Sequence, residues 1–449
     1  MSLKRRTWES LTLAASVAAM SMVVLTGCDT SAPAAPTKAP AAPASTQAAS
    51  AAAQPAAKVS EVKIGIIMPL TGGTATIGNQ CKAGSEVAVE EINAKGGIKS
   101  LGGAKMVLVP ADTQGKPEVA ATETERLALK ENVSVIMGAY ASGTTFPATE
   151  VSERLKVPWV VHSAVKDEIT ERGFKYVFRP CNKSMFDDKE MLSAVAYFKK
   201  ETGKCPTNVA LLYEGTDWGR SVGDGLKKQV DSYGLKIVMD ESYTQGMSSF
   251  QSQILKIKSS GAEAVFLAQY TPDHMLFNKG AMENKLNLPY GLLSLGAGAE
   301  DPAFYEQMDP KSFAYMFVQE DWDISGPDKQ PWIADASKKI QAKINYPINS
   351  YAAMGYSNMY IIADALERAA SADREKLRDA LSKTNITSGP PLIMGYTGIK
   401  FDETGQNTMS HGVISQNLNG KRTILFPVEN KADPSAKPVW PVPNWEDRK

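Results

Sequence analysis

The feature that most constrains the fold is an alternation of strand-like and helix-like segments that runs twice along the chain. Short apolar runs such as 62–68 and 133–137 alternate with segments whose apolar residues recur at helical spacing, such as 81–94. The series ends at the extended stretch 176–180 and starts again at 208–213. Strands that alternate with helices indicate a parallel sheet with helices on both faces. Two such series predict an α/β protein with two similar lobes.

The other expected elements follow the same pattern. Further strand-length runs are expected over 106–110, 158–161, 236–239, 264–268 and 289–293. Further helices are expected up to about 155 and over 117–131, 219–231, 250–259, 273–283, 331–344 and 351–370. Strand-like pieces lie over 313–318, 412–415 and 423–426.

The N-terminus has the features of an export signal. Three basic residues, Lys4 to Arg6, precede an uncharged run over 11–25, which ends in Leu-Thr-Gly-Cys at 25–28. A basic start, a short apolar run and small residues before a cut are typical of secretory signals. The run is too short for a comfortable membrane span. Its ending resembles the lipobox of bacterial lipoproteins, which implies a signal peptide over 1–27 and a lipid on Cys28; the alternative is a soluble signal with a chance cysteine.

The residues after Cys28 predict a tether and a location. Residues 28–59 are rich in Ala, Pro, Ser, Thr and Gln, a composition that cannot bury enough apolar area to fold and that predicts a flexible linker. We therefore expect an exported protein, lipid-anchored in the cell envelope, either in the periplasm or on the outer face of the cytoplasmic membrane. The chain has 49 basic and 49 acidic residues, so its charge gives no sign of a nucleic-acid partner.

The cysteines and the glycine-rich loop give no sign of a cofactor. Cys81, Cys181 and Cys205 remain after the signal, and none has the spacing of a zinc ligand. The last two are separated mostly by an expected helix, so no disulfide is predicted. The loop over 71–78 lacks the Gly-Lys-Ser/Thr ending of a phosphate-binding loop. We expect neither a metal nor a bound cofactor.

A loop that follows the strand over 133–137 is the best single candidate for a ligand contact. Residues 138–147 carry Ser142, Thr144 and Thr145 where a helix is expected to begin. The first N–H groups of a helix have no partner within it, so they form a site for a carboxylate or another anion. Taken alone, the loop is more typical of an ordinary capped turn, and the features that follow favour the ligand contact.

Similar loops follow the other expected strands. Ligands of open parallel sheets bind outside the carboxyl ends of the strands. Those ends are expected to carry the loops 69–78, 139–145, 162–166, 214–219, 269–273 and 294–301. Two lobes whose loops face each other would enclose a cleft for a small molecule.

Several segments, in the same order along the chain, resemble those of a known family. Residues 62–72 and 84–98, followed by 138–147, 213–219 and 441–445, resemble the branched-chain amino-acid (Leu/Ile/Val) periplasmic binding proteins. The resemblance implies a type I periplasmic binding fold, with two Rossmann-like lobes joined by three crossovers near 179–180, 318–319 and 392–394. It implies one lobe over 60–180 and 319–393, and another over 181–318 and 394–449. It also implies the solute-binding component of an ABC importer, with the permease subunits as partners.

The resemblance also implies ligand contacts. Ser142 lies where the family holds the ligand carboxylate, and Ser163, Ala164 and Val165 match the next strand-end loop. Trp218 and Tyr270 match aromatic residues that cover the ligand from the second lobe. Further candidates are Tyr140, Thr144, Ser294 and Trp322. The family's first-lobe disulfide is missing, because its positions fall near Gln114 and Ala141.

One departure from the family concerns the ligand's amino group. Ser294 stands where an acidic residue would pair with it, and a buried ammonium without a carboxylate partner is costly. The acids Asp217, Glu300, Asp301 and Asp321 could substitute for it. Alternatively, the ligand has a carboxylate or amide and no ammonium, as an aromatic acid does. The expected ligand class is therefore an amino acid, an amide or an aromatic acid.

The two alternatives to a transport function are a hydrolase and a ligand sensor. Residues 219–223 fit the Gly-x-Ser-x-Gly pattern of hydrolases, but Ser221 comes several residues after its strand, unlike a nucleophile elbow. The chain has only three histidines, and of these His162 borders the expected cleft whereas His274 and His411 are expected on the surface. We therefore expect no enzyme. The alternative within the same fold is a ligand sensor that signals to a membrane receptor.

Overall fold

The computed structural model describes residues 59–326, 331–346 and 348–448. The expected signal peptide over 1–27, the lipidated Cys28 and nearly all of the expected tether over 28–59 lie outside these residues. Among the helices described, none is both long and apolar enough to cross a membrane.

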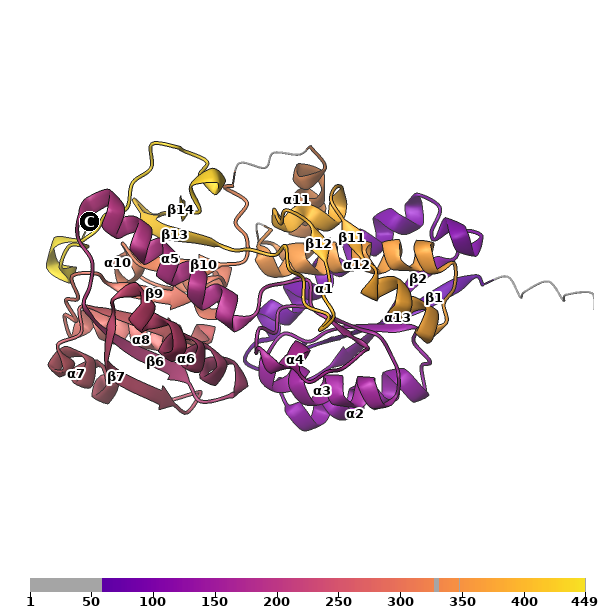
Figure 1. Ribbon diagram of the computed structural model, residues 1–449, viewed down its shortest axis with the longest axis horizontal. Helices are drawn as coiled ribbons and strands as arrows, with labels where there is room; N and C mark the ends of the chain where they lie inside the picture. The colour runs from indigo at the N-terminus through magenta and orange to yellow at the C-terminus, as the bar shows by residue number, and fades with distance from the viewer. Residues whose placement is uncertain (1–58, 327–330, 347, 449) are drawn as a thin grey trace, which may run out of the picture. The chain divides into compact units, whose positions relative to one another are not determined.

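The first lobe is built on a five-stranded parallel sheet in the order β2-β1-β3-β4-β5. Its strands are β1 (Glu61–Met68), β2 (Lys105–Asp112), β3 (Val135–Gly138), β4 (Trp159–Val161) and β5 (Val177–Phe178). The helices between them are α1 (Ala75–Ala94), α2 (Pro117–Leu129), α3 (Ser142–Arg154) and α4 (Glu168–Glu171). Helices α2 and α3 pack together on one face of the sheet, and α1 lies on the other (Figure 1).

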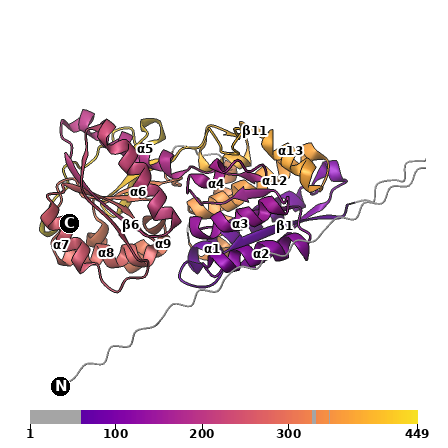
Figure 2. The same ribbon diagram turned by 60° about the horizontal axis from the view of Figure 1, so that its bottom comes forward.

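Three helices from much later in the sequence complete the first lobe. These are α11 (Pro331–Ile344), α12 (Ser350–Ala369) and α13 (Arg374–Ser382). Helix α12 packs along α1, and α11 also contacts α1. Figures 1 and 2 show these late segments, in orange, beside the early ones, in indigo and purple.

The second lobe is built on a seven-stranded sheet in the order β14-β13-β10-β9-β8-β6-β7. Its parallel strands are β6 (Asn208–Glu214), β7 (Lys236–Tyr243), β8 (Ala264–Ala268), β9 (Leu292–Leu295) and β10 (Phe317–Glu320). The antiparallel strands β13 (Val413–Leu418) and β14 (Lys421–Phe426) extend one edge. The helices are α5 (Ser184–Thr202), α6 (Asp217–Gln229), α7 (Gln251–Ser260), α8 (Thr271–Glu283), α9 (Pro302–Gln307) and α10 (Pro310–Phe313).

The predicted α/β class with two Rossmann-like lobes is confirmed, whereas two strand positions were wrong. The run over 289–293 becomes a strand only at Leu292, after Gly291 with φ of +70°. The run over 313–318 becomes a strand only at Phe317. There the Asp309 carboxylate accepts a hydrogen bond from the Lys311 N–H (2.9 Å) and starts the short helix α10. Local capping therefore overrides the apolar pattern.

The chain passes between the lobes in three segments. The first lies between β5 and α5, that is, between Phe178 and Ser184. The second was expected at 318–319, but these residues pair within the second sheet as part of β10, so the chain leaves that sheet only after Glu320. The third follows the 3-10 segment Pro390–Met394, includes the short strand β12 (Ile399–Lys400), which pairs with β11 (Asn385–Ile386), and reaches β13 at Val413.

Glycine allows α1 and α12 to lie in close contact. A Cβ atom on Gly84 would come within 1.9 Å of the Ala352 carbonyl oxygen, and one on Gly355 within 2.3 Å of the Cys81 carbonyl oxygen. Real Cβ atoms do not approach so closely, so each helix presents a bare glycine to the backbone of the other. This contact fixes the start of α12, which carries Tyr351, against the first lobe.

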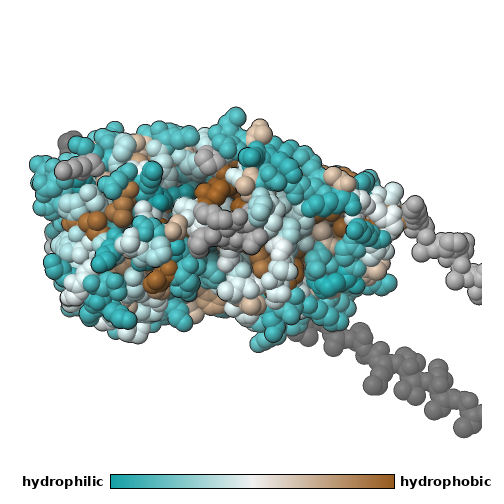
Figure 3. Space-filling model, turned by 90° about the horizontal axis from the view of Figure 1, so that it is seen from above, coloured by the Kyte–Doolittle hydropathy of each residue, from teal (hydrophilic) through white to brown (hydrophobic). Residues whose placement is uncertain are grey.

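The described surface and the described cysteines have ordinary features. The face seen in Figure 3 is mainly hydrophilic, with small separate hydrophobic patches. Large hydrophobic side chains with high exposure include Leu129 and Leu255, which lie apart on α2 and α7, and single exposed residues of this kind are ordinary. Cys81, Cys181 and Cys205 are free thiols, and the first two are buried.

Candidate functional site

A pocket between the two lobes lies at the carboxyl ends of their strands. We call it the cleft, and about 40 Å³ inside it is open to the centres of water-sized molecules. The first lobe lines it with Tyr140, Ala141, Ser142, Ser163, Val165 and Tyr351. The second lobe and the residues that follow it line the cleft with Asp187, Trp218, Val222, Tyr270, Leu295, Gly296, Ala297, Glu300, Gln319 and Asp321.

Six of the predicted contacts line this one cleft. They are Tyr140, Ser142, Ser163, Val165, Trp218 and Tyr270. Each follows the carboxyl end of a strand or begins the next helix. The structure therefore brings together side chains that lie as far as 130 residues apart, as the position of the strand ends predicts.

The other four predicted contacts do not line the cleft. Ala164 is buried behind it, and Ser294 is buried within β9, where the following residues line the cleft instead. Thr144 lines a neighbouring pocket, and its hydroxyl donates to the Ala141 carbonyl (2.9 Å). Trp322 lines a third pocket, beside Gly395 and His411.

One end of the cleft is the N-terminus of α3. The N–H groups of Thr144 and Thr145 bond back to the Ala141 carbonyl (3.2 and 3.0 Å). The Ser142 hydroxyl oxygen accepts a hydrogen bond from the Lys166 N–H (3.1 Å), which leaves its hydrogen free to be donated. The start of a 13-residue helix also carries partial positive charge. This end is therefore suited to a carboxylate or an amide oxygen.

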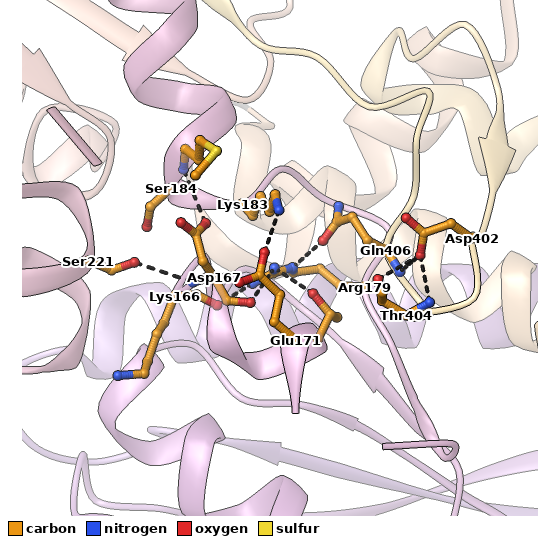
Figure 4. Close-up of polar contacts among 12 residues, drawn as sticks. Lys166, Asp167, Glu171, Arg179, Lys183, Ser184, Ser221, Asp402, Thr404 and Gln406 are labelled. Atoms are coloured by element: carbon orange, nitrogen blue, oxygen red, sulfur yellow. Dashed lines mark hydrogen bonds and ion pairs between the residues drawn. The ribbon is translucent and has the colours of Figure 1, made fainter. Parts of the chain in front are cut away.

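Arg179 holds the loop that follows β4 in place. Its guanidinium is fully buried and donates to the carbonyls of Ala164 (3.1 Å) and Lys166 (2.7 Å). Its Nε donates to Gln406 Oε1 (2.6 Å), on the third crossover. Figure 4 shows this side chain between Gln406 and the segment that contains Lys166 and Asp167. The cleft residues Ser163 and Val165 are thus carried on a loop tied to a crossover.

Polar contacts join the lobes beside the cleft, and two of them involve the loop after β4. Lys166 Nζ pairs with Asp217 Oδ1 at 2.8 Å. The Asp167 N–H donates to the Ser221 hydroxyl oxygen at 3.3 Å, as Figure 4 shows. Ser221 lies inside α6 and not at a strand end. Its role in the structure is therefore a contact between lobes, which accounts for the serine of the Gly-x-Ser-x-Gly pattern.

Aromatic rings from both lobes form the sides of the cleft. The Trp218 and Tyr270 ring centroids lie 4.7 Å apart, and those of Tyr140 and Tyr270 lie 5.9 Å apart. Tyr140 also meets Tyr351 edge to face at 5.4 Å. Sequence reasoning missed Tyr351. Its only signal was its place at the start of a helix after a crossover, where the Asn349 side chain caps the helix.

Acidic residues from the second lobe and the segment that follows β10 also line the cleft. Of the four acids that could substitute at the Ser294 position, Glu300 and Asp321 line the cleft, whereas Asp217 and Asp301 do not. Asp217 pairs with Lys166, as above, and Asp301 caps α9. Asp187 also lines the cleft. It lies in the first turn of α5 and not in a strand-end loop, so the pattern did not find it.

Burial makes these three carboxyl groups hard to ionise. It raises the pKa of Asp321 to about 7, with a further contribution from the charge of Glu190. The pKa values of Asp187 and Glu300 are raised well above their usual range. Burial is the largest cause in both, and the charge of Asp321 is the next. Removal of charge from water disfavours the ionised form in each case.

His162 links two cleft residues. Its Nε2 donates to the Tyr351 carbonyl (3.0 Å), so Nδ1 is free to accept from the Ser163 hydroxyl (3.0 Å). Burial lowers the pKa of His162 to about 4. His274, expected on the surface, is instead fully buried, and burial lowers its pKa to about 3.

We expect His162 to make stability depend on pH. Because the folded pKa lies below that of the unfolded chain, the neutral ring is favoured at pH 7 and this contribution is lost as the pH falls from about 6.5 to 4. The free energy of unfolding of the wild type relative to His162→Gln should therefore fall by about 3 kcal/mol between pH 7 and pH 4. Urea unfolding of both proteins at several pH values measures this difference. A difference that does not change with pH would contradict the prediction.

The comparison with known proteins decides the family. A family model described as "Periplasmic binding protein" matches residues 61–421. The chain belongs to this family. The chain is also 31% identical over 377 residues to the Leu/Ile/Val-binding protein homolog 7 of Brucella abortus, covering 82% of this chain and 92% of that protein. The predicted family is thereby confirmed.

Solved structures show the same fold. A leucine binding protein from Thermotoga maritima aligns with a TM-score of 0.70 at 24% identity, over 81% of this chain and 97% of that one. A solute binding protein of an ABC transporter from R. palustris, in complex with 4-hydroxybenzoate, aligns with a TM-score of 0.68 at 21% identity, over 84% and 98% of the two chains. The predicted type I periplasmic binding fold is confirmed.

Proposed function

We propose that this chain is the solute-binding component of an ABC importer and that the cleft captures a small amino-acid-like, carboxylate or amide solute for delivery to the permease. The observation that carries the proposal is a cleft that joins the N-terminus of α3, several aromatic rings and polar groups from both lobes. Members of a binding-protein family bind without covalent chemistry, and we propose no enzymatic activity. Family membership and the match to the Brucella protein, over 82% of this chain and 92% of that protein, support this function.

Each side of the cleft has a distinct role in this proposal. Ser142 and the first N–H groups of α3 hold the carboxylate or amide oxygen, with Ser163 beside them. Trp218 and Tyr270 cover the solute from the second lobe, and Val165 adds apolar contact. The lobes close about the three crossovers. We place the first lobe over 60–180 and 321–393, since β10 belongs to the second sheet.

The location follows from the N-terminal sequence. We propose that residues 1–27 are removed, that Cys28 carries a lipid and that residues 28–59 tether the binding protein to the membrane surface. The lipobox-like ending at 25–28 and the composition of the tether support this. Separation of cells into membrane and soluble fractions tests the anchor, because an unanchored protein would appear in the soluble fraction.

The test of the proposed function is a thermal-shift panel with the purified full chain. The panel contains leucine, other amino acids including L-arginine, agmatine, putrescine, urea, short amides and benzoates. A solute that binds the folded state should raise the melting temperature by mass action. Ser142→Ala should then weaken binding of the best solute by about 10-fold, because a hydrogen bond to a charged or strongly polar group is lost.

A matched control uses a serine outside the cleft. Ser382 is exposed on α13, and its hydroxyl donates to the Asp379 carbonyl (3.0 Å). Ser382→Ala should leave the affinity unchanged. If no solute of the panel raises the melting temperature, the proposed function is wrong; if Ser142→Ala and Ser382→Ala behave alike, the role of Ser142 is wrong.

A further inference from the structure

Three carboxyl groups from separate parts of the chain meet on one wall of the cleft. Asp187 comes from α5, Glu300 from the segment after β9 and Asp321 from the segment after β10. We call these three residues the acidic wall. In the part of the chain that the structure describes, no Lys, Arg or His is among the residues that line the cleft.

The groups that bond to the acidic wall are neutral. Asp187 Oδ1 accepts from Asn182 Nδ2 (2.9 Å) and from Gln319 Nε2 (3.0 Å). Glu300 Oε2 accepts from the Ser350 hydroxyl. Asp321 Oδ1 is buried and has no hydrogen-bond partner among the described residues, and the side chain of Asp321 lines the cleft. The residue is only 7% exposed.

The nearest arginines are engaged elsewhere. Arg422 pairs with Glu320 and with Asp323 Oδ2 (3.0 Å). Arg179 donates to backbone carbonyls and to Gln406, as described above. Neither residue lines the cleft. A buried carboxylate without a compensating charge is costly to a fold, and unpartnered groups of this kind are concentrated at functional sites.

We propose that the acidic wall selects a solute of net positive charge, that is, a small solute that carries more amine, amidine or guanidine groups than carboxylates. This inference rests on the proposed function, and it names the chemical class of the solute. Two carboxyl groups side by side can accept the parallel N–H groups of an amidine or guanidine. The rings of Tyr140, Tyr351 and Trp218 offer the faces that attract organic cations.

The same charges work against an aromatic acid. A benzoate placed in the cleft would be repelled by Asp321 whenever that carboxylate is ionised, and no Lys or Arg is among the described lining residues to offset the repulsion. The carboxylate end of a zwitterion can avoid this cost because it can bind at the N-terminus of α3, away from the wall. A zwitterion with a second, basic group fits both ends.

The affinity for such a cation should rise with pH. Asp321 has a pKa of about 7, so its carboxylate is mostly protonated at pH 6 and mostly ionised at pH 8. The titratable and charged groups around the acidic wall are Asp188, Glu190, Glu320, Arg179, Arg422, Tyr140, Tyr351, Tyr396 and Cys181. Because a cation binds the ionised wall, its affinity should increase by about 10-fold from pH 6 to pH 8. A benzoate should show the opposite trend.

Calorimetric titration of the full chain tests the proposal. The probes are L-arginine, agmatine, putrescine, L-leucine and benzoate, each at pH 6 and pH 8. We expect at least one of the three cationic probes to bind about 10-fold more tightly than leucine and benzoate at pH 8, as expected for a desolvated charge pair. Asp321→Asn should weaken that probe by about 10-fold or more at pH 8 and remove most of the pH dependence.

A control and a second readout separate a binding effect from a folding effect. Asp335 is exposed on α11, and Asp335→Asn should bind every probe as the wild type does. Asp321→Asn should lose affinity for the cation and not for benzoate, a change in preference that misfolding cannot produce. If leucine or benzoate binds the wild type more tightly than every cationic probe, this inference is wrong and the proposed function stands. If none of the solutes in the thermal-shift panel binds, the proposed function itself is wrong.

Discussion

Replacement of Arg179 with methionine is expected to lower the free energy of unfolding by about 3 to 5 kcal/mol, because it removes a buried cation that several acceptors need. The carbonyls of Ala164 and Lys166 and the Gln406 amide oxygen would lose their donor in a site that water cannot reach. Each buried acceptor left without a donor costs about 1 to 3 kcal/mol. Methionine keeps much of the length of the side chain, so the effect isolates the hydrogen bonds.

Two measurements check this result. Urea unfolding gives the global change, and hydrogen exchange at residues 163–167 reports whether the loop after β4 opens locally. The control is Arg126→Met on α2, where the arginine pairs with Glu123 and Glu131 at the surface. Such pairs contribute about 0 to 1 kcal/mol. Equal losses in the two variants would show that the Arg179 network does not hold the loop.

Replacement of Trp218 with alanine is expected to weaken binding of the best solute in the thermal-shift panel by about 100-fold, an effect typical of a central aromatic contact. Trp218 is 6% exposed, lines the cleft and packs against Tyr270. Its removal would leave one side of the solute in water and would free the Tyr270 ring. Because Trp218 comes from the second lobe, the loss also removes one of the contacts made on closure.

The affinity of this variant can be measured by calorimetry, with Trp332→Ala as the matched control. Trp332 is partly buried on α11 and does not line the cleft. Its replacement should change the affinity by less than about 2-fold, because distant sites act independently. A Trp218→Ala variant that binds as tightly as the wild type would show that the solute lies elsewhere.

The fold and part of the cleft could be predicted because they follow from local patterns. The alternation of apolar runs and amphipathic segments indicates βα units, and the carboxyl end of each strand indicates where a ligand lies. Ser142, Ser163, Trp218 and Tyr270 were found in this way, since each follows a strand within a few residues.

Asp187 and Tyr351 could not be found from such patterns, and Glu300 and Asp321 could be named only among four alternatives. Asp187, Tyr351 and Asp321 each lie just after a crossover or in the first turn of the helix that follows one. Their position in the cleft depends on how the two lobes come together, which no window of neighbouring residues records. The resemblance implies that Ser294 occupies the position of the acid that pairs with the ligand's amino group. In the structure Ser294 does not line the cleft, whereas Glu300 and Asp321 do.

The close contact between α1 and α12 has a consequence for how the chain is made. Gly84 on α1 leaves space only for the backbone of α12 at Ala352, which is synthesised some 270 residues later. Until then the α1 face of the first sheet lacks its covering helix, and contacts so distant in sequence form slowly. A fragment that ends at Phe178 would therefore not be an independent folding unit. During synthesis the first lobe can complete its fold only after α12 has been made. Until then the apolar face of α1 is available to chaperones.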